Sequence, residues 1–322
     1  MLQDAFGRQF SYLRLSITDL CNYRCNYCLP DGMPCADYSS LSLDHIGHIA
    51  AAFAAMGIEK IRITGGEPSV RKDLPQIIRL LKETPGIKSV VMTTNGHKMS
   101  KYLDSWADAG LDALNISCDS LDPRVFDAIT GRDELDKLLE AIKLAQISAI
   151  KTIKINTVLL KQYNLTDLHK LIDWVKDSDL TLRFIELMET GDNADYFASN
   201  HVSAETVQKL LVQTGWQQTI RDKAAGPAKE FKHADYQGKI GFIAPYSKDF
   251  CDSCNRLRVS SSGKLHLCLF GDSGYDLTPM LVPGKEIELQ NYLSEVLQTK
   301  PISHFLQEHN TGSTAQLAML GG

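Results

Sequence analysis

The chain has 322 residues, of which 43% are hydrophobic, enough for a buried core and for two domains. Its formal net charge is −5 and its pI is near 6.0, so there is no overall positive charge to favour nucleic-acid binding. An anionic substrate would need a local group of basic residues. The first twelve residues lack the apolar stretch of a secretion signal, and the longest uncharged run nearby, residues 46–58, is too short to span a bilayer. We therefore expect a cytoplasmic protein without a membrane segment, and its eight cysteines indicate metal binding or catalysis over disulfide bonds.

Expected strands and helices alternate along the first two-thirds of the chain. Strand-like runs rich in β-branched and apolar residues cover 12–17, 60–64, 89–94, 113–118, 152–159 and 181–187. Helical patterns cover 43–56, 74–82, 101–109, 135–147 and 168–175, the last with Thr166 and Asp167 as candidate N-caps. Strands separated by crossover helices pair in parallel, so this order predicts a barrel or an open doubly wound sheet.

The loop after the first expected strand carries Cys21, Cys25 and Cys28 in C-x3-C-x2-C spacing. Three thiolates can hold three corners of a four-iron cluster, and the missing fourth ligand leaves one iron open. An open iron can bind the amino and carboxylate groups of S-adenosylmethionine (SAM) and reduce its sulfonium, which yields a 5′-deoxyadenosyl radical. This spacing, with the aromatic Tyr27 before the third cysteine, is the signature of radical SAM enzymes. The alternative is a zinc knuckle with a distant fourth ligand.

Other unusual residues lie mostly where the expected strands end. They are Gly65-Gly66-Glu67-Pro68 after the second, Thr93-Thr94-Asn95-Gly96 at the third, Ser117-Cys118-Asp119-Ser120 at the fourth, Lys154 and Asn156 within the fifth, and Glu186-Leu187-Met188 at the sixth. Barrel enzymes build their active sites at the carboxyl ends of the strands. Six units instead of eight predict an α/β fold with an incomplete (βα)6-type TIM barrel, residues 1–220. We expect a C-terminal α+β domain, residues 221–322, to cover its open side.

A second set of cysteines, Cys251, Cys254 and Cys268, lies in the C-terminal third, where we expect strands at 239–243 and 257–260 and a helix at 287–298. Three thiolates can belong to a structural metal site or to a second cluster with an open iron, and spacing alone does not choose between them. His266 could be a fourth metal ligand, although it is only two residues from Cys268. We interpret Cys35 and Cys118 as ordinary thiols, with Cys118 buried at a strand end.

Two arginines, Arg256 and Arg258, follow Cys254 directly. On a strand, residues i and i+2 project to the same face, and guanidinium groups bind phosphate oxygens bidentately. Next to a three-thiolate site, this pair predicts a phosphorylated substrate. The alternative is a solvated strand edge. No Walker A motif occurs, so a nucleotide would not be held by a P-loop.

Taken together, several segments resemble the GTP 3′,8-cyclases of molybdenum-cofactor biosynthesis, the MoaA family. The matching segments are Leu13-Arg14-Leu15-Ser16-Ile17-Thr18-Asp19, Lys60-Ile61-Arg62-Ile63-Thr64-Gly65-Gly66-Glu67-Pro68, Asn115-Ile116-Ser117, Lys154-Ile155-Asn156, Gly241-Phe242-Ile243-Ala244-Pro245 and Cys251-x2-Cys254-Asn255-Arg256-Leu257-Arg258. The resemblance runs from about residue 6 to the terminal Gly321-Gly322. Two departures are Cys118, where an aliphatic residue is more common, and Gly312-Ser313-Thr314, which lacks a common arginine.

The resemblance implies two 4Fe–4S clusters and SAM as cofactors. Cys21, Cys25 and Cys28 would bind the SAM-cleaving cluster, and Cys251, Cys254 and Cys268 would hold a second cluster that meets the guanine base. The SAM site would be lined by Tyr27, Gly66, Ser117 and Met188. GTP would be contacted by Arg14, Arg62, Thr93, Lys154, Arg256, Leu257 and Arg258. Arg256, Arg258, Gly321 and Gly322 would act in catalysis, with the glycine tail reaching into the substrate cavity.

The implied reaction converts GTP into (8S)-3′,8-cyclo-7,8-dihydroguanosine 5′-triphosphate, an early step of molybdopterin synthesis. The expected partners are GTP, a flavodoxin- or ferredoxin-like reductant and the next enzyme of the pathway, and a homodimer stays open. One alternative is a radical SAM enzyme that modifies peptides, although fully ligated auxiliary clusters would need more cysteines than remain here. A second alternative is a non-enzymatic iron–sulfur or zinc module, which would have no use for the glycine-rich loops at strand ends.

Overall fold

Parallel strands, each followed by at least one helix, make up the first two-thirds of the chain in the computed structural model, which describes residues 1–30, 32, 40–219, 227–271, 274–314 and 320. In chain order the strands are β3 (Tyr12–Ser16), β4 (Lys60–Thr64), β5 (Ser89–Thr94), β6 (Ala113–Ser117), β7 (Thr152–Leu159) and β8 (Thr181–Glu186). Each pairs in parallel with the next. All six were predicted to within one residue. The predictions for Cys35, Gly321 and Gly322 fall outside the described residues.

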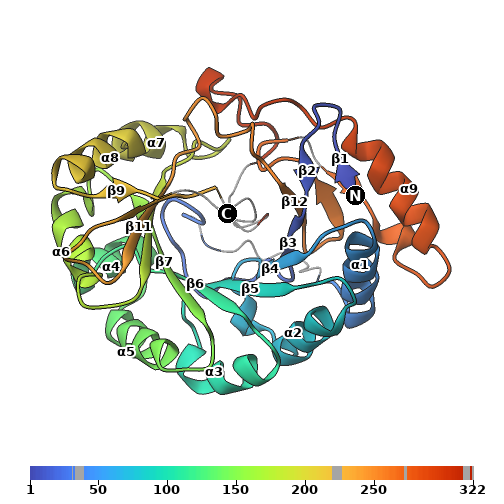
Figure 1. Ribbon diagram of the computed structural model, residues 1–322, viewed down its shortest axis with the longest axis horizontal. Helices are drawn as coiled ribbons and strands as arrows, with labels where there is room; N and C mark the ends of the chain where they lie inside the picture. The colour runs from blue at the N-terminus through green and yellow to red at the C-terminus, as the bar shows by residue number, and fades with distance from the viewer. Residues whose placement is uncertain (31, 33–39, 220–226, 272–273, 315–319, 321–322) are drawn as a thin grey trace.

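Helices surround the outside of the strands, as Figure 1 shows. They are α1 (Leu43–Ala55), α2 (Leu74–Glu83), α3 (Met99–Asp108), α4 (Pro123–Thr130), α5 (Leu135–Gln146), α6 (Leu168–Trp174), α7 (Ala194–Asn200), α8 (Ala204–Gln213) and α9 (Glu286–Leu297). The sequence analysis missed α4, α7 and α8. None of the helices in the described ranges has the length and apolar character needed to cross a membrane.

The starts of two helices concern one helix that was missed and one N-cap that was predicted. Helix α4 begins with Pro123 after Asp122, whose carboxylate accepts the N–H groups of Arg124 and Val125 at 2.9 and 3.3 Å. This combination of proline and acidic N-cap is a recognisable start signal. Asp167 does occupy the N-cap of α6, but its side chain makes no capping bond because its backbone is not extended there.

Strands from the C-terminal third extend the six-stranded sheet at both edges. At one edge β11 (Lys239–Ile243) pairs in parallel with β8, followed by antiparallel β10 (Lys229–Lys232) and β9 (Gln217–Gln218). At the other, β12 (Arg256–Val259) pairs in parallel with β3, followed by β13 (Lys264–His266) and β14 (Tyr275–Asp276). The short β1 (Leu2–Gln3) and β2 (Gln9–Phe10) form a separate hairpin. The predicted α/β partial barrel is confirmed, while the domain boundary at residue 220 stays a prediction.

The curved sheet has an apolar outer face and a polar inner face. In β7 the buried Ile153, Ile155 and Leu159 alternate with Lys154 and Asn156. Successive strand residues point to opposite faces, so Lys154 and Asn156 face the interior of the barrel. The inner face also carries five buried arginines, Arg14, Arg62, Arg183, Arg256 and Arg258, none more than 8% exposed. A barrel interior that holds this much charge is suited to a polar ligand, because unpaired buried charge is costly.

Candidate active site

Two adjoining cavities hold the two cysteine sets. The first cavity, about 1030 Å³ up to its open mouth, is lined by Cys21, Cys25 and Cys28. The second cavity, about 840 Å³, is lined by Cys251, Cys254 and Cys268. Both are also lined by Asn156, Ile185 and Met188. The two cysteine sets, far apart in the sequence, therefore face neighbouring spaces that three side chains connect.

The first cavity brings together all the residues that were predicted for the SAM site. Tyr27, Gly66, Ser117 and Met188 line it beside the three cysteines. They come from the loops after β3 and β4, the end of β6 and the segment after β8. These positions are carboxyl ends of parallel strands, where barrel enzymes place their active sites. Their individual binding roles remain predictions.

The glycine loop after β4 packs directly on the backbone that leads into Cys21. The N–H of Gly66 donates to the carbonyl of Thr18 at 2.8 Å, and the N–H of Glu67 donates to that of Leu20 at 2.7 Å. A Cβ atom added at Gly66 would lie 2.2 Å from the Leu20 carbonyl oxygen. Gly65 has a φ of +149°, a conformation that L side chains rarely adopt. The two glycines are therefore required for the cysteine loop to lie where it does.

Two buried carboxylates hold the surroundings of the first cysteine set. Glu67 accepts the N–H of Ser69 at 2.9 Å, the hydroxyl of Thr94 at 2.7 Å and the N–H of Asn95 at 2.7 Å. Asp119 accepts the hydroxyl of Tyr27 at 2.9 Å and the N–H of Val158 at 2.8 Å. These bonds tie the loops after β4, β5 and β6 to the cysteine loop.

Burial and negative charge dominate the electrostatics of this cavity. Burial raises the pKa of Asp119 to about 6 and that of Cys21 to about 11. Burial and the carboxylate of Asp119 raise the pKa of Cys25 well above its ordinary value. Further negative charge is disfavoured here, so the first cavity favours a ligand or metal group that brings positive charge.

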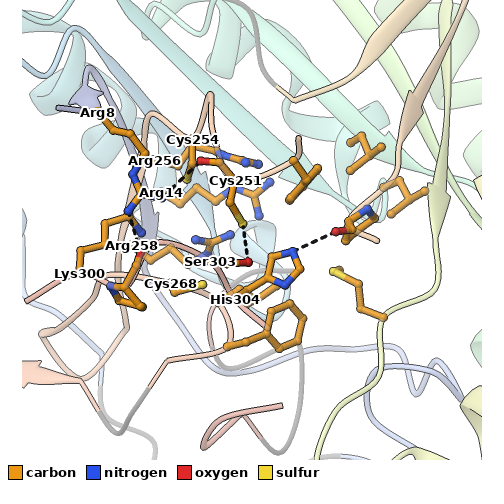
Figure 2. Close-up of a pocket in the computed structure, with 18 of the residues that line it drawn as sticks. Arg8, Arg14, Cys251, Cys254, Arg256, Arg258, Cys268, Lys300, Ser303 and His304 are labelled. Atoms are coloured by element: carbon orange, nitrogen blue, oxygen red, sulfur yellow. Dashed lines mark hydrogen bonds between the residues drawn. The ribbon is translucent and has the colours of Figure 1, made fainter. Parts of the chain in front are cut away.

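Arginines from three adjacent strands form one row on the wall of the second cavity. Arg258 on β12 pairs in register with Arg14 on β3, which pairs with Arg62 on β4. All three line the cavity, as does Arg256. Two residues earlier on the same three strands, Arg256, Tyr12 and Lys60 are paired in register in the same way. Figure 2 shows Arg14, Arg256 and Arg258 around the same space as the three cysteines.

Burial and mutual repulsion destabilise the charges of these arginines. The pKa of Arg14 lies well below its ordinary value because of burial, and then because of Arg258 and Arg62. Burial and Arg62 lower the pKa of Arg183 to about 9. Within the described ranges, the Nε atoms of Arg62, Arg183 and Arg258 make no hydrogen bond. A polyanion with many oxygen acceptors would relieve both costs.

The second cysteine set lies in a basic environment. Burial raises the pKa of the Cys254 thiol, but Arg256 and Lys300 outweigh this effect and lower it to about 7. Free thiols beside buried cations fit the donor chemistry of an iron–sulfur cluster, whose ligands are thiolates. His266 lines other cavities and not this one. In the described part of the chain, no three His, Cys, Asp or Glu side chains are arranged around a single metal ion. The ligand roles of the six cysteines therefore rest on their spacing and donor chemistry.

Three residues predicted to contact GTP lie away from the arginine row. Thr93 lines the first cavity, and Lys154 lines neither cavity. The Lys154 Nζ lies 3.2 Å from Glu230 Oε1 instead. The side chain of Leu257 is 1% exposed and belongs to the apolar core. A substrate contact by Leu257 would therefore involve its backbone.

Several residues of the second cavity were missed by the sequence analysis. Arg8 donates to the carbonyls of Cys251, Pro301 and Ile302 at 3.3, 2.7 and 2.7 Å, and it pairs with Asp4 at 2.6 Å. It thereby anchors the second cysteine loop to the N-terminal segment. No local pattern shows this role of Arg8, because its three carbonyl acceptors lie more than 240 residues away in the sequence.

His304 was also missed, and its hydrogen bonds define a structural role. Its Nδ1 accepts the N–H of Leu306 at 3.0 Å, so in the neutral ring Nε2 carries the proton and donates to the carbonyl of Pro245 at 2.9 Å. Both ring nitrogens are thus occupied. Burial lowers the pKa of His304, which favours this neutral form. The ring fixes the loop beside Cys251 (Figure 2).

The last described residues of the chain, Thr314 and Leu320, line a third cavity, and Leu320 belongs to an apolar cluster next to both cysteine sets. The carbonyl of Thr314 accepts the N–H of Gly191 at 3.1 Å, and its hydroxyl donates to the carbonyl of Leu269. Leu320 is 6% exposed and packs with Leu269, Phe270 and Leu306. Cys28, Met188 and Cys268 pack against the same small cluster, so this cluster connects the tail with residues of both cysteine sets.

Comparison with known proteins agrees with this division of the site. Residues 15–175 match the model of the radical SAM superfamily, and residues 180–306 match the family described as Molybdenum Cofactor Synthesis C. Proteins named GTP 3′,8-cyclase from Pectobacterium atrosepticum and Yersinia pestis are each 49% identical to this chain, over 100% of its length and 99% of theirs. The chain belongs to the GTP 3′,8-cyclase family. Family membership confirms the predicted cofactors, SAM and 4Fe–4S clusters.

Solved structures confirm the radical SAM fold. Streptococcus suis SuiB bound to S-adenosylmethionine superposes with a TM-score of 0.61 at 14% identity, over 91% of this chain and 68% of that chain. SuiB bound to its precursor peptide SuiA gives 0.58 at 15% identity, over 91% and 67%. At such low identity, these two structures show that the fold is similar and nothing about the substrate. The full-length relatives are named GTP 3′,8-cyclase, so the alternative of a peptide-modifying enzyme is not favoured.

Proposed function

We propose that this protein converts GTP into (8S)-3′,8-cyclo-7,8-dihydroguanosine 5′-triphosphate, an early step of molybdenum-cofactor biosynthesis. The observation that carries the proposal is the row of Arg258, Arg14 and Arg62, in a cavity that adjoins the one holding the radical SAM cysteines. The full-length match to proteins named GTP 3′,8-cyclase supports the same substrate.

In this proposal the first cavity binds SAM. A cluster held by Cys21, Cys25 and Cys28 would supply the electron for reductive cleavage of SAM. Tyr27, Gly66, Ser117 and Met188 would line the cofactor. The carboxylates of Glu67 and Asp119 nearby favour the positive sulfonium over an anion. The backbone bonds between the glycine loop and residues 18–20 keep the site in place before SAM arrives.

The second cavity would bind GTP beside a cluster held by Cys251, Cys254 and Cys268. The arginine rows would neutralise the triphosphate, with Arg14, Arg62, Arg256 and Arg258 as ligands. We assign further contacts to Thr93, Lys154 and the Leu257 backbone. Arg256 and Arg258, which follow closely on Cys254 in sequence, would also act in catalysis by orienting the nucleotide.

The connection between the cavities would bring the reacting atoms together. Asn156, Ile185 and Met188 line both spaces, so a ribose positioned there could reach groups in each. The terminal Gly321 and Gly322 follow in sequence on Leu320, which is buried in an apolar cluster that Cys28, Met188 and Cys268 also contact. Deleting both glycines should leave iron content and SAM binding unchanged but abolish cyclisation. If the truncated enzyme cyclises GTP at the wild-type rate, the two terminal glycines have no role in catalysis.

The remaining assignments rest on family membership. We place the enzyme in the cytoplasm, with a flavodoxin- or ferredoxin-like reductant and the next enzyme of the pathway as partners. A homodimer is compatible with this function but not required by it.

The test is an anaerobic assay with SAM, dithionite and GTP carrying deuterium at C3′. The expected products are 5′-deoxyadenosine containing deuterium and a cyclised nucleotide of unchanged triphosphate content. Without GTP, 5′-deoxyadenosine should still form slowly but should contain no deuterium. Turnover of SAM without transfer of deuterium would confirm a radical SAM enzyme but refute GTP as its substrate.

A further inference from the structure

One carboxylate lies among the cations on the inner face of the barrel. Glu230 on β10 places Oε1 3.2 Å from the Lys154 Nζ, and both side chains are 28% exposed. In the described residues, no other carboxylate forms an ion pair with Lys60, Arg62, Lys154 or Arg183. A carboxylate repels phosphate groups, so a site that binds a triphosphate through cations would not be expected to contain Glu230.

The sheet register shows why Glu230 reaches this place. Glu230 lies opposite Gly241 on β11, which is in register with Arg183 on β8. Gly241 leaves room between them, because a Cβ atom there would lie 3.0 Å from the Arg183 Cγ. The backbone of Glu230 is held from both sides, by β11 and by the N–H of Thr219, which donates to its carbonyl at 2.8 Å. The carboxylate is therefore presented by a paired strand and not by a free loop.

Glu230 acts electrostatically on two cations. Burial and the neighbouring Arg183 lower the pKa of Lys154, and Glu230 counteracts them. Burial and Arg62 lower the pKa of Arg183, and Glu230 again acts in the opposite direction. The single carboxylate thus stabilises the charged forms of both residues while no nucleotide is bound.

We infer that Glu230 is an internal counter-ion, which occupies Lys154 until the triphosphate displaces it. A phosphate that approaches Lys154 meets a carboxylate already bound there and must break that ion pair. Glu230 therefore stabilises the nucleotide-free protein and weakens triphosphate binding. This inference rests on the proposed function for naming GTP as the source of the triphosphate and Lys154 as one of its ligands. The displaced group and the cations that receive the phosphates belong to this chain.

The test compares Glu230→Gln with the wild type, with their clusters in place, by calorimetric titration of inorganic tripolyphosphate and of GTP. We expect Glu230→Gln to bind both about tenfold more tightly, because the competing charge is gone and the shape is kept. Its affinity should also fall more steeply with salt. The midpoint of thermal unfolding without nucleotide should decrease.

The control is Glu205→Gln on α8, which removes the same charge from an exposed pair, Glu205 and Lys209, 3.0 Å apart and 72% and 71% exposed. It should change neither affinity. Combining Glu230→Gln with Lys154→Gln should abolish the gain, because the displaced pair no longer exists. If Glu230→Gln does not fold, Glu230→Asp withdraws the carboxylate by one methylene and should give a smaller gain.

Unchanged or weaker tripolyphosphate binding by Glu230→Gln would overturn the inference, since Glu230 would then be irrelevant or would hold Lys154 in its binding position. No measurable binding by either protein would overturn it as well. The proposed function is tested by a different measurement. If the wild-type enzyme does not cyclise GTP, the proposed function is refuted, but tighter binding of tripolyphosphate by Glu230→Gln would still support the role of Glu230 as a counter-ion.

Discussion

The two cysteine sets share a donor pattern but lie in opposite electrostatic environments. Around the first set, burial and Asp119 raise the pKa of Cys25 well above its ordinary value. Around the second, Arg256 and Lys300 outweigh burial and lower the pKa of Cys254 to about 7. Three thiols therefore specify a class of metal group, while the surrounding charges determine the ligand that joins it. A sulfonium fits the first cavity, and a triphosphate fits the second.

The two environments also have different structural origins. The first is built from loops at strand ends, where Glu67 and Asp119 accept hydrogen bonds from the loops after β3, β4 and β5. The second is built from the inner face of β12, β3 and β4, which presents Arg258, Arg14 and Arg62 in register. Loops can be adjusted locally to a cofactor, whereas a row on a sheet is fixed by strand pairing.

The largest expected effect comes from removing one cysteine set at a time. Replacing Cys251, Cys254 and Cys268 by Ala should leave about four of about eight irons per chain, with SAM cleavage retained but cyclisation lost. Replacing the first set should also leave about four irons but abolish SAM cleavage. Iron analysis and 5′-deoxyadenosine formation measure both. Loss of SAM cleavage in both variants would contradict the division between the cavities.

A pair of glycines tests how closely each cysteine loop is packed. Gly66→Ala should displace the first cysteine loop, because its Cβ would lie 2.2 Å from the Leu20 carbonyl oxygen. We expect this variant to lose about half of its iron and all SAM cleavage. Gly271→Ala is the matched control beside the second set, since its Cβ would lie an ordinary 3.6 Å from the Cys268 carbonyl oxygen. Equal iron loss in both would show that neither loop depends on close packing.

The acidic surroundings of the first set predict a pH-dependent stability. Burial raises the pKa of Asp119 from 3.8 to about 6, so the folded chain holds this proton more tightly than the unfolded chain does. The contribution of Asp119 is therefore most favourable below pH 4 and is lost as the pH rises to 6, by about 3 kcal/mol. Asp119→Asn should not lose stability in this way, because its side chain does not ionise. In urea unfolding between pH 4 and pH 7, the free energy of unfolding of the variant should therefore rise relative to that of the wild type. If the difference between the two free energies does not change with pH, Asp119 does not have a raised pKa in the folded chain.

The smallest effect concerns Tyr12, beneath the arginine row. Its ring lies 5.2 Å from the Lys60 Nζ and 5.3 Å from the Arg62 Cζ, while its hydroxyl has no hydrogen-bond partner in the described ranges. Tyr12→Phe keeps the ring and should change the Kd for GTP by less than about twofold. Tyr12→Leu removes the cation–π contacts and should weaken binding by about 1 kcal/mol. Equal affinities would show that the ring does not position these cations.

Local patterns were sufficient for most of the scaffold. The six strands of the barrel were predictable because apolar and β-branched runs ended at Gly, Asn or Asp. Helix α7 has no side-chain cap that could have predicted its start, whereas α8 follows Ser203, whose hydroxyl accepts the N–H of Glu205 and is a start signal that was missed. The direction of the Leu257 side chain follows from the strand period, since Arg256 and Arg258 face the cavity and their neighbour must face the core.

The two cysteine sets, the glycine loop and the Arg256–Arg258 pair could be recognised from sequence alone, because each is a short pattern whose spacing has chemical meaning. The row of Arg258, Arg14 and Arg62, and the contact of Glu230 with Lys154 across 76 residues of chain, became visible only in the folded structure. Both depend on strand register, which joins residues that no local pattern relates. The chemistry of each set could be read locally, but the charge of the space between them arises from how the sheet is assembled.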